Sequence, residues 1–246
     1  MSGGEAGAVR PPEVIVALDF PAADAALAMA SRLPEGTWVK VGLELFTAAG
    51  PAVVERLVGR GHPVFLDLKV HDIPNTAAGA VRSAARLGAR LLTVHASGGR
   101  AMLEAAAEAA GTSKGAGSMG RLRLLAVTVL TSLDDAALAE VMGRGAGTEE
   151  AVGRLAALAN GSGIDGAVAS VAECRAVKAV CGADFLVATP GIRLAGGDAH
   201  DQKRVATPAE ARAAGADYLV VGRAITAAED PAAALARVRE EAGAVG

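Results

Sequence analysis

Residues 64–87 read VFLDLKVHDIPNTAAGAVRSAARL and contain one complete strand–helix unit. The unit begins with a short apolar run, residues 64–68, of the kind that forms a strand buried on both faces of a parallel sheet. In residues 77–87, apolar side chains recur three and four positions apart, which gives a helix one apolar face. A chain built from such units is predicted to adopt an α/β fold.

The same unit recurs along the whole chain of 246 residues. Seven further apolar runs lie at residues 14–18, 37–41, 91–95, 124–129, 166–169, 185–188 and 218–221. Eight strand–helix units in a chain of this length predict a single-domain (β/α)₈ TIM barrel over residues 13–246, with a doubly wound open sheet as the alternative. The open sheet is disfavoured because no G-x-G-x-x-G motif follows the first run. Residues 1–12 are small, Gly-rich and end in Pro-Pro, which predicts a disordered tail.

The composition restricts the functional class. The chain has 24 Lys and Arg against 27 Asp and Glu, a formal charge of −3, which argues against a nucleic-acid or anionic-membrane partner. Two Cys and four His argue against a disulfide framework or a structural zinc site. Because no apolar run approaches the roughly 18 residues of a membrane span, we expect a cytoplasmic protein with no membrane partner.

Charged residues gather where the predicted strands end, which is the edge at which barrel enzymes hold their active sites. Asp67 and Lys69 are two apart in the third run, so regular alternation points both side chains into the barrel interior. Opposite charges in an apolar interior cost several kcal/mol unless they are paired or used. With Asp19 after the first run and Lys40 in the second, the set favours a functional site over a structural ion pair.

Two arginines follow the last two predicted strands. Arg193 and Arg223 come after the seventh and eighth runs, where barrels commonly bind phosphate. Gly191 and Gly222 precede them and allow close backbone approach, and a guanidinium suits phosphate oxygens. The alternative is a surface arginine after a helix-capping glycine, but two at both expected ends favour a phosphate site.

Six segments resemble the common bacterial form of the orotidine 5′-monophosphate decarboxylase family. They are Ala17-Leu18-Asp19, Lys40-Val41-Gly42, residues 67–76 (DLKVHDIPNT), Leu130-Thr131-Ser132, residues 189–193 (TPGIR) and Val221-Gly222-Arg223. The D-x-K-x-x-D pattern alone is shared with related barrels that act on sugar phosphates, whereas the extended H-D-I-P-N-T and P-G-I-R segments are more specific. The resemblance spans residues 14–226.

The resemblance implies a homodimer that converts orotidine 5′-monophosphate to UMP and CO₂, the last step of UMP synthesis, with no metal and no organic cofactor. It implies a catalytic network of Lys40, Asp67, Lys69 and Asp72, in which Lys69 donates the proton and Asp72 comes from the neighbouring subunit. The implied substrate-binding residues are Asp19 and Lys40 at the ribose, Asp67 and Thr76, Thr131 near the pyrimidine, and Arg193, Gln202, Gly222 and Arg223 at the phosphate.

Two other functions fit the same residues. One is a Mg²⁺-dependent sugar-phosphate lyase or decarboxylase, such as a hexulose phosphate synthase, because those relatives share Asp67, Lys69 and Asp72. The other is a non-catalytic phosphate-binding barrel that acts as a sensor or scaffold. Sensitivity to a chelator distinguishes the first, and nucleotide binding without turnover distinguishes the second.

Overall fold

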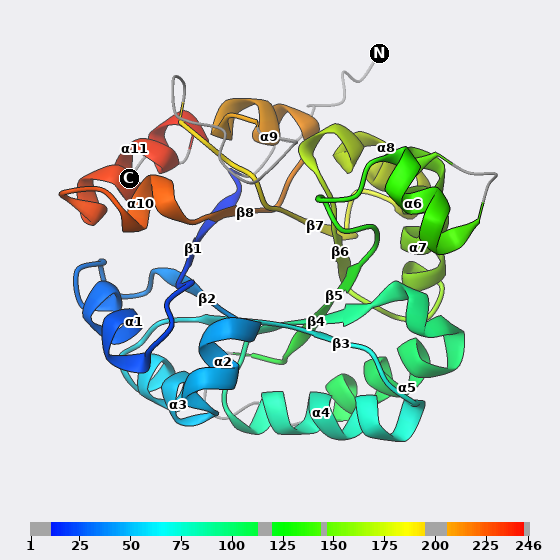
Figure 1. Cartoon of the computed structure of the whole chain (residues 1–246), viewed down its shortest axis with the longest axis horizontal. Helices are drawn as coiled ribbons and strands as arrows, with labels where there is room; N and C mark the ends of the chain where they lie inside the picture. The colour runs from blue at the N-terminus through cyan, green and yellow to red at the C-terminus, as the bar shows by residue number, and fades with distance from the viewer. Residues whose placement is uncertain (1–10, 113–119, 144–146, 195–205, 244–246) are drawn as a thin grey trace, which may run out of the picture.

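The computed structural model describes residues 11–112, 120–143, 147–194 and 206–243. Within these residues, eight parallel strands close into a barrel in sequence order, with β8 paired to β1 (Figure 1). The predicted single-domain (β/α)₈ fold is confirmed. Most of the predicted tail, residues 1–10, lies outside the described residues.

The elements follow the predicted alternation of strands and helices. The strands are β1 (Glu13–Ala17), β2 (Trp38–Gly42), β3 (Val64–Val70), β4 (Leu91–His95), β5 (Arg123–Val127), β6 (Gly166–Val168), β7 (Leu186–Thr189) and β8 (Tyr218–Val221). The helices are α1 (Ala23–Ala30), α2 (Leu43–Ala49), α3 (Ala52–Gly59), α4 (Pro74–Arg86), α5 (Gly99–Thr112), α6 (Asp135–Met142), α7 (Thr148–Asn160), α8 (Val171–Cys181), α9 (Pro208–Ala214), α10 (Arg223–Thr226) and α11 (Pro231–Glu241), with a 3₁₀ turn η1 (Ala96–Gly98).

The helices surround the ring of strands (Figure 1), and the main apolar core lies between the two layers. Leu66 and Leu92 from the strands and Val81 and Leu103 from the helices are fully buried in this core.

Local sequence sets where the helices begin. Pro74 occupies the first turn of α4, where its missing N–H costs nothing. None of the described helices is both long enough and apolar enough to cross a membrane.

Alternate strand residues point into the barrel, because side chains in a strand alternate with a period of two. A small apolar cluster fills the interior; Phe65 of β3 belongs to it, and the partly buried Trp38 of β2 packs against it. Two residues further along the same strands stand Lys40 and Asp67. The interior therefore changes from apolar to charged toward the carboxyl ends of the strands. The candidate site lies at this charged end of the barrel.

Strand β3 is irregular near its carboxyl end. Its pairing with β4 passes from Leu66 opposite Leu92 to Val70 opposite Val94, so four residue steps on β3 face two on β4. Within this bulge Lys69 has a φ of 50°, and it is the one non-glycine among the described residues with positive φ. Such a conformation costs about 1–3 kcal/mol and is commonly found at functional sites.

Candidate active site

A cavity of about 540 Å³ lies at the carboxyl ends of the strands. Its apolar wall includes Phe65, Val127, Val168 and Val220. Nine of the residues singled out in the sequence line it as well: Asp19, Lys40, Asp67, Lys69, Thr131, Gly191, Arg193, Gly222 and Arg223. The structure thus brings together side chains from strands that lie far apart in the sequence.

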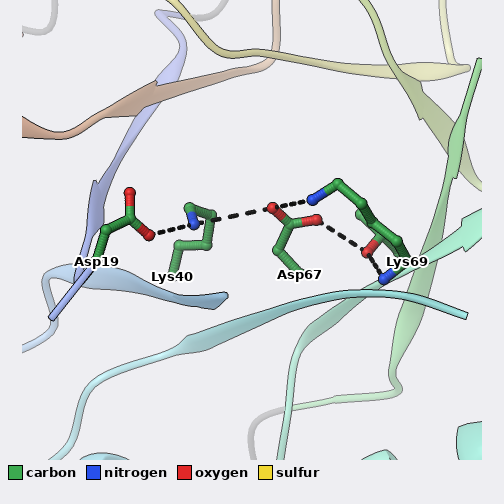
Figure 2. A network of polar contacts seen from close by, with 5 residues as sticks. Asp19, Lys40, Asp67 and Lys69 are labelled. Carbon is green, nitrogen blue, oxygen red and sulfur yellow. Dashed lines mark hydrogen bonds and ion pairs between the residues drawn. The ribbon is translucent and has the colours of Figure 1, made fainter. Parts of the chain in front are cut away.

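Four of these residues form a row of alternating charges, which Figure 2 shows from close by. Lys40 Nζ lies 2.8 Å from Asp19 Oδ1 and 3.8 Å from Asp67 Oδ2. Lys69 Nζ lies 2.9 Å from the same Asp67 Oδ2. Each cation therefore has an anion beside it, and the carboxylate of Asp67 lies between two ammonium groups.

Burial differs along the row. The side chains of Lys40 and Asp67 are only 10% and 17% exposed, whereas those of Lys69 and Asp19 are 31% and 58% exposed. Taking a charge out of water costs several kcal/mol unless it is compensated. Lys40 and Asp67 compensate one another in the interior, and the ammonium of Lys69 reaches the open part of the cavity.

The structure explains why position 42, directly after Lys40-Val41, is a glycine. A Cβ at this position would lie 3.0 Å from Lys40 Nζ and 3.4 Å from Asp19 Oδ1. Glycine therefore leaves room for the ion pair between these two residues, a role that the sequence alone does not reveal.

Thr93 belongs to the network, although sequence analysis did not select it. This residue of β4 is fully buried. Its hydroxyl donates a hydrogen bond to Asp67 Oδ1 at 3.0 Å and accepts one from the Lys69 N–H at 2.8 Å. A threonine inside an apolar strand carries no signal of this kind, because the partner strand and its bulge define the role.

Arg193 and Arg223 lie together on one side of the cavity. The Arg193 N–H donates to the carbonyl of Ala206 at 2.9 Å, and the Ala206 N–H donates to the carbonyl of Gly191 at 3.2 Å. Gly191 has a φ of 82°, a conformation that favours glycine. Burial, and then the positive charge of Arg223, lowers the pKa of Arg193. Because an anion between the two guanidinium groups would relieve their repulsion, this side suits a phosphate.

His95 ends β4 beside the charged row. Burial is the largest cause that lowers its pKa below 6.5, followed by the charges of His71 and Lys69, while Asp67 acts in the opposite direction. The ring stacks on His71 with centroids 5.2 Å apart. His95 is therefore neutral near pH 7.

Two predicted site residues, Asp72 and Thr76, do not line the cavity of this chain. Asp72 and Thr76 are exposed beyond β3, and Asp72 Oδ1 accepts a hydrogen bond from the Ile73 N–H at 2.7 Å. Gln202 lies outside the described residues. Over the described ranges, no group of three or more His, Cys, Asp or Glu side chains is arranged to hold a metal ion.

The fold and the cavity define a class of protein, a (β/α)₈ barrel with a charged cavity at the carboxyl ends of its strands, where barrels of this kind hold their active sites. A family model described as "Orotidine 5′-phosphate decarboxylase / HUMPS family" matches residues 12–238. The chain belongs to this family, as its motifs predicted.

Individual relatives agree with the family match over nearly the full length. The orotidine 5′-phosphate decarboxylase of Halorhodospira halophila is 57% identical over 237 residues, which are 96% of this chain and 98% of the relative. That of Moorella thermoacetica is 52% identical over 230 residues, 93% of this chain and 91% of the relative. The crystal structure of orotidine 5′-phosphate decarboxylase from Lactobacillus acidophilus aligns with a TM-score of 0.84 at 38% identity, covering 94% of this chain and 98% of that one.

Proposed function

We propose that this barrel decarboxylates orotidine 5′-monophosphate to UMP and CO₂ in pyrimidine biosynthesis, with Lys69 as the proton donor. The observation that carries the proposal is the ammonium of Lys69, held 2.9 Å from Asp67 in the cavity. The proposal is also supported by a relative that is named for this reaction and is 57% identical to this chain.

The chemistry needs a cation and a proton at one carbon. When the bond between the ring and the carboxylate breaks, CO₂ leaves and the electron pair stays on the ring carbon, where delocalisation is poor. The Lys69 ammonium beside that carbon stabilises the developing charge. One of its protons then forms the new C–H bond of UMP, and the neutral amine regains a proton from solvent.

The neighbouring charges hold this ammonium in place. Asp67 contacts Lys69 and Lys40 through one carboxylate oxygen and Thr93 through the other. Because these groups are oriented before the substrate reacts, little reorganisation is needed in the transition state. The charge and the proton both come from side chains, so we propose that the reaction requires no metal and no organic cofactor.

The rest of the cavity binds the remainder of the nucleotide. Arg193, Gln202, Gly222 and Arg223 bind the phosphate, Asp19 and Lys40 the ribose, and Thr131 the region of the pyrimidine. The phosphate is remote from the bond that breaks. Its binding energy can therefore be used to hold the reacting ring in the geometry of the transition state.

The active enzyme is a cytoplasmic homodimer in which Asp72 and Thr76 complete the cavity of the partner subunit. Both residues are exposed and lie outside the cavity lining of their own chain. Between them, the apolar side chain of Ile73 is 67% exposed. A subunit interface over this segment would cover Ile73 and bring the Asp72 carboxylate to a neighbouring lysine.

A spectrophotometric assay of orotidine 5′-monophosphate loss, run with and without EDTA, tests this function. We expect turnover that EDTA does not change. Turnover of a sugar phosphate only in the presence of Mg²⁺ would instead identify the lyase. UMP binding by folded protein without any turnover would identify a non-catalytic barrel, and either result would overturn the proposal.

A further inference from the structure

We infer that Thr93 is a positioning residue that sets the backbone conformation of Lys69 and the orientation of the Asp67 carboxylate. The inference rests on the proposed function, because it assigns Thr93 a part in the same reaction. Thr93 is not among the residues that line the cavity, so it acts through Asp67 and Lys69 rather than by touching the substrate.

The Thr93 hydroxyl uses both of its hydrogen-bonding capacities on the network. It donates its single proton to Asp67 Oδ1 at 3.0 Å and accepts the Lys69 N–H at 2.8 Å. A hydroxyl has one donor and two acceptor sites, so both bonds form together. The side chain is 0% exposed, which excludes water as a ready substitute for either bond.

The bulge in β3 explains why Lys69 needs this acceptor. Between Leu66 and Val70 the register with β4 shifts, and Thr93 is the β4 residue opposite the extra residues. The Lys69 N–H donates to the side-chain hydroxyl of Thr93 at 2.8 Å. Without the hydroxyl, this N–H would lose its bond to Thr93, and the positive φ of Lys69 would lose a contact that supports it.

The same hydroxyl fixes the orientation of the Asp67 carboxylate relative to the lysines. With Oδ1 bonded to Thr93, Oδ2 is directed toward Lys69 Nζ at 2.9 Å and Lys40 Nζ at 3.8 Å. Rotation of the carboxylate would change both ion-pair distances. Thr93 therefore links the backbone that carries the proton donor to the anion that orients it.

Thr93→Val and Thr93→Ser test the inference in the full-length protein. Valine keeps the shape and removes the hydroxyl, whereas serine keeps the hydroxyl. We expect Thr93→Val to lower kcat about 10- to 100-fold, the effect of misplacing a catalytic group by about 1 Å. KM for orotidine 5′-monophosphate and the affinity for UMP should change less than about threefold, because the phosphate contacts are intact. Thr93→Ser should restore kcat to within a few-fold of the wild type.

Thr37→Val is the matched control. Thr37 is also fully buried, and its hydroxyl donates to the Pro34 carbonyl at 2.7 Å just before β2, at the opposite end of the barrel. We expect it to lose stability without losing kcat. Should Thr93→Val fail to fold, Thr93→Ala removes the hydroxyl without placing a methyl group against Asp67, and the same loss of kcat is expected.

Several results would overturn the inference. These are wild-type kcat in folded Thr93→Val, equal losses of kcat in Thr93→Val and Thr37→Val, or no rescue by serine. Crystal structures of the variants test the geometry without activity, since an unchanged Lys69 φ and Asp67 orientation in Thr93→Val would also contradict it. Inactive, folded wild-type protein would instead contradict the proposed function, and the structural comparison would still decide the role of Thr93.

Discussion

Lys69 Nζ lies 2.9 Å from Asp67 Oδ2, although Lys69 stands in a bulge of β3 and its backbone does not have the conformation of a regular strand. Regular alternation would also have placed the two side chains on one face, but the contact is made from a φ of 50°. The pair thus depends on a strained backbone that the surrounding structure supports.

Lys69→Ala should remove decarboxylation while leaving UMP affinity within about threefold. Loss of the proton donor and of the charge at the ring carbon together should lower kcat by more than about 10⁴-fold. Single-turnover kinetics and a UMP titration measure the two effects. Lys69→Arg keeps a positive charge but presents a rigid fork that does not release a proton, so it should stay inactive. Substantial residual turnover in Lys69→Ala would contradict the role of Lys69.

Mixing two inactive variants tests the shared site. If Asp72 serves the partner subunit, a heterodimer of Asp72→Ala and Lys69→Ala contains one cavity with both wild-type residues. Random assembly of equal amounts makes half of the dimers mixed, so about a quarter of wild-type activity should return. The measurement is kcat after subunits are unfolded and refolded together. Each variant refolded alone is the control, and no recovery in the mixture would argue for sites built within single chains.

Arg193→Gln and Arg223→Gln should each raise KM for orotidine 5′-monophosphate about 10- to 100-fold, the effect of losing a hydrogen bond to a charged group. Neither change should affect turnover of the nucleoside orotidine to the same extent, since orotidine lacks the phosphate. The ratio of kcat/KM for the two substrates measures this. Arg56→Gln on the outer helix α3 is the control. An unchanged ratio in the cavity variants would place the phosphate elsewhere.

Gly42→Ala should lower kcat/KM at least about tenfold. Its Cβ would stand 3.0 Å from Lys40 Nζ and displace the ammonium from Asp19. Gly59→Ala in α3 is the matched control, because a Cβ there meets nothing within 4 Å. It should keep wild-type kcat/KM and unfold at the same or a slightly higher temperature. Equal kinetics for the two variants would contradict the role of Gly42.

His95 should make the protein less stable in mild acid. Its pKa in the folded state lies below the ordinary value of 6.5, so over that interval the unfolded chain binds more protons. The free energy of unfolding should therefore fall as pH decreases from 6.5 through the folded-state pKa. Urea unfolding at pH 7.5 and pH 5.5 measures this, and His95→Gln should show a smaller decrease. An identical decrease in both proteins would contradict the assignment.

The barrel was predictable because its signal is local and repeated. Each apolar run is short and is followed by a helical pattern, so element type and order follow from neighbouring residues. The exact ends of the strands were less predictable. The predicted run at residues 124–129 overlaps β5, which is Arg123–Val127, and the predicted run at 166–169 extends one residue past β6, which is Gly166–Val168. Thr128 and Val129 are buried beyond the end of β5, so an apolar pattern continues where strand pairing has stopped.

The sequence by itself predicted that the side chains of Asp67 and Lys69 share the interior face of one strand, because a period of two within a strand depends only on the order of residues. It also placed Arg193 and Arg223 after the last two strands. Only the tertiary structure decided that Thr93 holds Asp67 and Lys69, that Gly42 leaves room for Lys40, and that Asp72 stays outside the cavity of its own chain. The physical reason is that a bulge, a close contact and a loop direction arise between segments distant in sequence, where no local pattern records them.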